Sequence, residues 1–306
     1  MGSGGWTHED YANYAYTTKA SYLKSDGSLS RKMSVQEMYT SDRLHPDMDI
    51  CGKFRECCDS VEHPNTIPVI LALDVTGSMS SCLMEVAESL NPIMTSLYGK
   101  VTDIEFAIMA IGDLAYDDAP IQISQFESDI RIAENLDKVY FEQGGGGNSY
   151  ESYTAAWEIG LNRCQLDCWK RGKKGIIITL GDEMCNPYLP GKRLGTIVGH
   201  PQILRDVETK NLYPQVCEKF DVYHVSISDS LSYICHRPDV DKSWAFLGNN
   251  YAISSVKDLK QTIERIILSA VRNQNNTVSQ VLVQNDPISG DQQGFGPFGF
   301  TNNISW

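Results

Sequence analysis

The sequence predicts an α/β domain whose strands are buried on both faces. Three long stretches with an apolar centre carry this prediction, at residues 67–75, 104–113 and 173–183. Runs of this kind, rich in Val, Ile and Leu, are typical of strands that are covered on both sides, as in parallel sheets. At 306 residues the chain can hold one large α/β domain with extensions.

The first of these strands leads into a helix through a polar turn. Asp74, Thr76, Gly77 and Ser78 follow the apolar run, and apolar residues then recur every three or four positions over residues 80–98. Because open α/β sheets bind ligands at the carboxyl ends of their strands, we expect a site at this turn. The alternative is an ordinary strand–helix turn in which Ser78 or Ser80 caps the helix.

The residue types of the turn indicate a metal site. One carboxylate and two hydroxyls at alternate positions are oxygen ligands, with no His or Cys among them. Such a set suits a hard divalent cation, Mg²⁺ above all, with Mn²⁺ or Ca²⁺ as alternatives. A phosphate-transfer site of the haloacid dehalogenase type needs a second carboxylate where this chain has Thr76, which argues against that chemistry.

Two further strands end in acidic residues, at Gly112-Asp113 and Gly181-Asp182. We therefore expect Asp113 and Asp182 at the same rim as Asp74. The other expected elements are a short edge strand at 121–126, helices near 128–138, 155–161, 200–219 and 255–273, a loop at 184–199 and a strand at 220–227. We expect Cys164 and Cys168 to share one face of a helix and to pack in the core.

Asp74-Val75-Thr76-Gly77-Ser78 resembles the Asp-x-Ser-x-Ser signature of von Willebrand factor type A domains, with Thr in place of the first Ser. The resemblance covers about residues 66–273. It implies a doubly wound, Rossmann-like α/β fold, in which a mostly parallel central sheet carries helices on both faces. It also implies a metal-ion-dependent adhesion site.

The resemblance extends to two further segments. Asp182 matches the late aspartate of the family. The glycine-rich loop of the family supplies a hydroxyl ligand, usually Thr, but this chain has no Thr in the loop before Thr154. Ser149, Glu151 and Ser152 are the available substitutes. The expected metal ligands are therefore Asp74, Thr76, Ser78, Glu151, Ser152 and Asp182.

The function implied by the resemblance is cation-dependent binding, in which the ion takes an acidic residue of a partner protein. We expect no enzymatic activity, because no nucleophile stands in a recognisable setting. Two alternatives stay open. The chain is a structural subunit of a larger assembly bound through its termini, or it is a metal-dependent hydrolase with Glu151 or Glu183 as the base.

The domain is expected at residues 67–273, between an aromatic-rich N-terminal extension (1–66) that packs on the core or on a partner and a tail rich in Gly, Asn, Gln and Phe (274–306). The net charge of −13 disfavours direct nucleic-acid binding. We find no signal peptide and no membrane helix, and nine cysteines fit reduced thiols, so we expect a cytoplasmic location. Cys51, Cys57, Cys58 and His63 are either buried groups or, as the alternative, zinc ligands.

Overall fold

The computed structural model describes residues 5–19, 37, 41–141 and 150–284, and only the backbone of 276–284. Its centre is a sheet with the strand order β12-β11-β7-β2-β3-β4. All neighbouring strands run parallel except β4, which is antiparallel to β3 at the edge. The strands are β2 (Ile67–Asp74), β3 (Ile104–Ile111), β4 (Ile121–Ile123), β7 (Gly175–Gly181), β11 (Phe220–Ile227) and β12 (Tyr251–Ser254).

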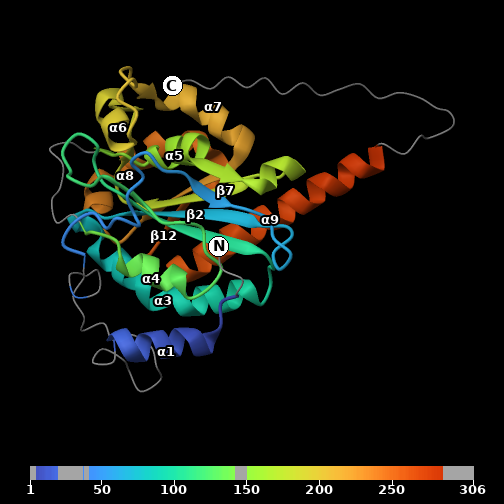
Figure 1. Cartoon of the computed structure of the whole chain (residues 1–306). Helices are drawn as coiled ribbons and strands as arrows, with labels where there is room; N and C mark the ends of the chain where they lie inside the picture. The colour runs from blue at the N-terminus through green and yellow to red at the C-terminus, as the bar shows by residue number, and fades with distance from the viewer. Residues whose placement is uncertain (1–4, 20–36, 38–40, 142–149, 285–306) are drawn as a thin grey trace, which may run out of the picture.

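Helices cover both faces of this sheet (Figure 1). One face carries α1 (His8–Lys19), α3 (Ser80–Tyr98), α4 (Arg131–Asp137) and α9 (Leu259–Gln284), whose side chains share one core with the sheet. The other carries α5 (Ala155–Arg163), α6 (Gly191–Ile197), α7 (Thr209–Lys219) and α8 (Leu231–Trp244) around a second core. Every residue of β3 and β7 is buried, as their apolar runs predict. The predicted doubly wound, mostly parallel α/β fold is confirmed.

The order of the strands creates a crevice between β2 and β7. From β2 the chain proceeds to β3 on one side, whereas from β7 it proceeds to β11 on the other side. This divergence is the topological switch point, and open α/β sheets bind ligands beyond the carboxyl ends of the strands there. Asp74 ends β2 and Asp182 directly follows β7, so both carboxylates lie at this point.

The segment before the sheet is packed against it. Trp6, Tyr11 and Ala15 are buried in the core shared with α3, and the carboxylate of Asp137 in α4 accepts hydrogen bonds from Tyr14 and Lys19. Further along, β1 (Arg55–Cys57) pairs with β6 (Cys164–Leu166). These contacts join residues 5–19 and 41–66 to the two cores.

Several expected elements differ in the structure. The stretch expected as a loop at 184–199 contains β8 (Met184–Cys185), β9 (Tyr188–Leu189) and α6, and the helix expected at 200–219 begins only after β10 (Val207–Glu208). The last helix starts at Leu259 and continues to Gln284, into the stretch expected as a tail. Cys164 and Cys168 are buried as expected but are not on one helix, because the backbone becomes extended at Cys164, which begins β6.

Two expectations concern residues outside the described ranges. The four glycines and Ser149, and the Phe-rich end of the tail, lie outside the described residues. None of the helices within the described ranges is long and apolar enough to cross a membrane.

Candidate cation site at the switch point

Asp74 is fully buried, and its carboxylate is held from two sides. Oδ1 accepts hydrogen bonds from the backbone N–H and the hydroxyl of Thr76, at 2.9 and 2.6 Å. Oδ2 accepts one from the hydroxyl of Tyr153 at 2.6 Å. Burial raises the pKa of Asp74 to about 7, and the neighbouring Asp182 adds to the rise, because two like charges oppose each other's ionisation.

The hydroxyls of Thr76 and Ser78 lie next to each other, with 3.4 Å between their oxygens. Since the Thr76 hydroxyl donates its proton to Asp74, its lone pairs are left for another partner. Ser78 is exposed in the 3-10 turn Gly77–Met79, so the pair reaches solvent. Neither serine caps α3, because the N-cap position is Met79, which makes no side-chain capping bond, and Ser80 donates to the carbonyl of Gly77 instead. The capping alternative is therefore wrong.

Asp182 lies with Asp74, Thr76 and Ser78, and its buried carboxylate lacks, among the described residues, the hydrogen bonds that such a group usually has. Both of its oxygens are buried and have no hydrogen-bond partner that meets normal geometry among the described residues. Burial raises its pKa, while the hydroxyls of Ser230 and Ser78 act in the opposite direction. A buried carboxylate without partners is costly, and it is stabilised by a proton or a cation.

Tyr153 was not identified from the sequence, yet it joins the ends of both strands. Its hydroxyl donates to Asp74 and accepts from the backbone N–H groups of Asp182 and Glu183, each at 3.2 Å. Gly181 makes this contact possible, because a Cβ at that position would lie 2.1 Å from the tyrosine oxygen. The ring packs edge-on against His224 and Trp244, which fixes its direction. No local pattern around Tyr153 indicates this role.

Glu151 lies in β5 (Tyr150–Glu151), which pairs with β8. Its Oε2 atom is buried without a hydrogen-bond partner in the described part of the chain. Burial raises its pKa to about 11, and the charges of Asp74, Asp117, Asp113 and Glu183 contribute further. Glu151 therefore lies close enough to Asp74 for their charges to oppose each other.

Ser152 and Thr154 have structural contacts. The Ser152 hydroxyl accepts a hydrogen bond from the backbone N–H of Leu114 at 2.9 Å, which ties the start of α5 to the loop after β3. Thr154 exchanges hydrogen bonds with the side chain of Asn186. Ser152 stays next to Glu151, but this hydrogen bond occupies one of its lone pairs.

Asp113 and Asp117 brace the loop after β3. Asp113 accepts from the backbone N–H of Ala115 at 2.7 Å, and Asp117 accepts from that of Asp113 at 2.7 Å. Gly112 is required beneath them, since a Cβ there would lie 2.3 Å from the Asp117 carboxylate. Both aspartates are buried and add negative potential to the rim.

Among the described residues, no basic side chain neutralises the acidic rim. Within the described ranges, no ion pair joins Asp74, Glu151 or Asp182 to a basic side chain. The described part of the chain contains no group of three or more His, Cys, Asp and Glu side chains arranged to hold a metal ion. A cation at this rim thus depends on the hydroxyls of Thr76 and Ser78 in addition to carboxylates. Oxygen atoms without partners next to these hydroxyls fit a hard divalent cation.

The cysteine and histidine cluster does not form a comparable site. Cys51 is exposed, whereas Cys57 is buried and its pKa is raised by that burial. The His63 ring lies 3.3 Å from a carboxylate oxygen of Asp103. All nine cysteines are free thiols. The zinc alternative finds no support in this part of the chain.

No family model and no curated protein matches the chain. Among solved structures, it is similar to the pilus adhesin SpaC from Lactobacillus rhamnosus GG in its open conformation, with 11% identity over 75% of this chain and a TM-score of 0.47. A second structure of that adhesin matches with 10% identity over 75% of this chain and a TM-score of 0.43. The chain spans about a third of the adhesin, 33% and 34% of its length. A likeness this distant carries no functional inference.

Proposed function

We propose that the chain is a divalent-cation-dependent protein-binding module. One observation carries the proposal: Asp74 and Asp182 are buried together at the switch point of the sheet, and the Asp182 carboxylate has only the hydroxyls of Ser78 and Ser230 near it, with no hydrogen bond of normal geometry among the described residues. A bound Mg²⁺, or Mn²⁺ or Ca²⁺ in its place, supplies an open coordination position that accepts a carboxylate oxygen of a partner. This role needs no nucleophile.

Each residue of the site has a distinct task in this proposal. Asp182 and the hydroxyls of Thr76 and Ser78 hold the cation, with Glu151 as a further carboxylate ligand and Ser152 as the alternative to it. Asp74 fixes the direction of the Thr76 hydroxyl and supplies negative charge. Tyr153 keeps Asp74 in place. The free thiols fit a reducing compartment, so we propose a cytoplasmic location.

Cation binding is tested by thermal melts and calorimetry with Mg²⁺ and Mn²⁺. Ligand at 100 times its dissociation constant stabilises the wild type by about 2.7 kcal/mol, which is readily visible as a higher melting temperature. Asp74→Ala and Thr76→Val should lose this gain, whereas Thr76→Ser, which keeps the hydroxyl, should retain it. An unchanged melt of the wild type at millimolar Mg²⁺ and Mn²⁺, with no heat of binding, contradicts the site.

Partner capture separates this proposal from its two alternatives. Capture from a lysate should depend on the cation and should be lost in Asp74→Ala while the fold is kept. If a chelator leaves every captured protein in place, the chain is instead a structural subunit bound through its termini. If the purified protein hydrolyses phosphoester, peptide or ester substrates with Mg²⁺ or Mn²⁺, and Glu151→Gln lowers that turnover by about 10² to 10⁴, it is a hydrolase.

A further inference from the structure

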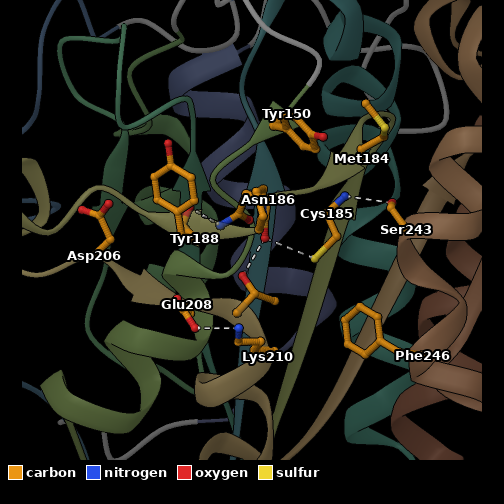
Figure 2. Close-up of a pocket in the computed structure, with 12 residues that line it drawn as sticks. Tyr150, Met184, Cys185, Asn186, Tyr188, Asp206, Glu208, Lys210, Ser243 and Phe246 are labelled. Carbon is orange, nitrogen blue, oxygen red and sulfur yellow. Dashed lines mark hydrogen bonds and ion pairs between the residues drawn. The ribbon is translucent and has the colours of Figure 1, made fainter. Parts of the chain in front are cut away.

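A hollow of about 490 Å³ lies beside the acidic rim, and the proposed function does not use it (Figure 2). Its size is within the range of ordinary ligand sites, roughly 300–1,000 Å³. Aromatic rings line it from three elements: Tyr150 of β5, Tyr188 of β9 and Phe246 after α8. Asp206, Glu208 and Lys210 line it from β10 and its flanks. The hollow is therefore largely apolar with charged groups at one side.

The hollow and the candidate cation site share the two-stranded ladder of β5 and β8. Tyr150 and Glu151 are consecutive residues of β5, and consecutive strand residues point to opposite faces. Glu151 is buried among the rim carboxylates, whereas Tyr150 is partly exposed and lines the hollow. A segment of a partner that reaches the rim therefore passes next to the hollow.

The charges of the hollow sum to one negative charge. Glu208 is paired with Lys210 at 3.1 Å. Asp206 is exposed and accepts one hydrogen bond, from the backbone N–H of Gly191 at 2.9 Å, and forms no ion pair with a basic side chain in the described ranges. Two carboxylates and one ammonium leave the charge of Asp206 uncompensated. Figure 2 shows its carboxylate on the same side of the hollow as the ring of Tyr188.

We infer that this hollow takes an arginine or lysine side chain of the same partner whose acidic residue binds the cation. The long apolar stem of such a side chain matches the aromatic walls, and its cationic head matches Asp206 and the faces of the tyrosine rings. The net charge of −13 on this chain also favours a partner that has a basic residue next to the acidic residue bound by the cation. The identity of the partner in this inference rests on the proposed function. The choice of a cationic side chain rests on the lining of the hollow alone.

The test uses Nα-acetyl-L-arginine methylamide as the probe, titrated into the full chain in EDTA and followed by NMR chemical shifts. We expect shifts at residues of the hollow. The Asp206→Asn variant should bind the probe about threefold to fivefold more weakly, the size expected for one exposed charge pair. The corresponding citrulline probe, which has the same shape without the charge, should be weakened similarly. Asp206→Asn keeps an oxygen that can accept from Gly191, so its fold should be intact.

Each outcome decides between defined alternatives. Equal binding of the arginine and citrulline probes, or an unchanged affinity in Asp206→Asn, overturns the inference. Agmatine binding more than tenfold tighter than the capped arginine also overturns it, because the hollow would then serve a free small amine. The titration contains EDTA, and Asp74→Ala should bind the probe as tightly as the wild type does. A failure of the cation site is therefore distinguishable from a failure of the hollow. Asp206→Asn should in turn keep the full Mg²⁺ response in a melt.

Discussion

Replacing Asp74 by asparagine tests whether the buried negative charge of Asp74 destabilises the folded chain when no cation is bound. The pKa of Asp74 rises in the folded chain from 3.8 to about 7, mainly through burial and then through Asp182. A folded-state pKa above the unfolded value means that the folded chain holds the proton more tightly. The protonated Asp74 therefore contributes to the free energy of unfolding. This contribution is fully present below pH 4 and is lost as the pH rises to about 7.

The size of this effect follows from the shift. About three pKa units at 1.36 kcal/mol each amount to about 4 kcal/mol of stability lost between pH 4 and pH 7. Asp74→Asn removes this loss, but the amide presents N–H groups to the Tyr153 hydroxyl, which costs about 1–2 kcal/mol at any pH. In EDTA the variant should therefore be less stable than the wild type at pH 4 and more stable by about 2–3 kcal/mol at pH 8.

Urea unfolding followed by tryptophan fluorescence measures this difference across the pH range in EDTA. Asp239→Asn, an exposed aspartate on α8, is the matched control and should track the wild type at every pH. Saturating Mg²⁺ should stabilise the wild type and not Asp74→Asn, so the advantage of the variant at pH 8 shrinks or disappears. A constant difference between variant and wild type from pH 4 to pH 8 refutes the argument that burial, with a contribution from Asp182, raises the pKa of Asp74 in the folded chain.

Three further predictions concern the supports of the site and of the fold. Tyr153→Phe should lower the free energy of unfolding by about 1–3 kcal/mol, because a buried carboxylate and two backbone N–H groups lose a hydrogen-bond partner, and should weaken Mg²⁺ binding in calorimetry. Gly181→Ala should destabilise by about 1–3 kcal/mol in urea, since the new methyl overlaps the tyrosine hydroxyl; combining it with Tyr153→Phe should cost less than the sum of the two changes. Trp6→Ala should cost about 3–5 kcal/mol if the N-terminal segment is held in the core as the structure has it, and an unchanged urea midpoint contradicts that packing.

The elements that sequence patterns predicted best are those buried on both faces. The runs that form β2, β3 and β7 consist almost entirely of apolar residues, because a strand covered on both sides has no solvent face to alternate with. The short or weakly patterned elements were missed. α8 contains Pro238 and few buried residues, so it shows no clear helical period, and β8 and β9 are two residues each.

The position of the candidate site was predictable for a related reason. Asp74 and Asp182 each follow an apolar run directly, and parallel strands that run in register place their carboxyl ends at one rim. Their residue types indicated hard-cation chemistry without knowledge of the strand order. The sequence by itself therefore determined that Asp74 and Asp182 lie at one rim, and its residue types led to the prediction of a hard cation there.

Only the tertiary structure decided which rim residues are neighbours and which of them have no partner. The adjacency of β2 and β7 depends on connections that cross the sheet, and local patterns of burial contain no information about which strand lies next to which. Tyr153 reaches Asp74 from a distance of 79 residues in sequence, through space left by Gly181. The lack of hydrogen bonds of normal geometry to Asp182 among the described residues likewise depends on everything packed around it, because desolvation depends on the surrounding atoms and not on the residue itself.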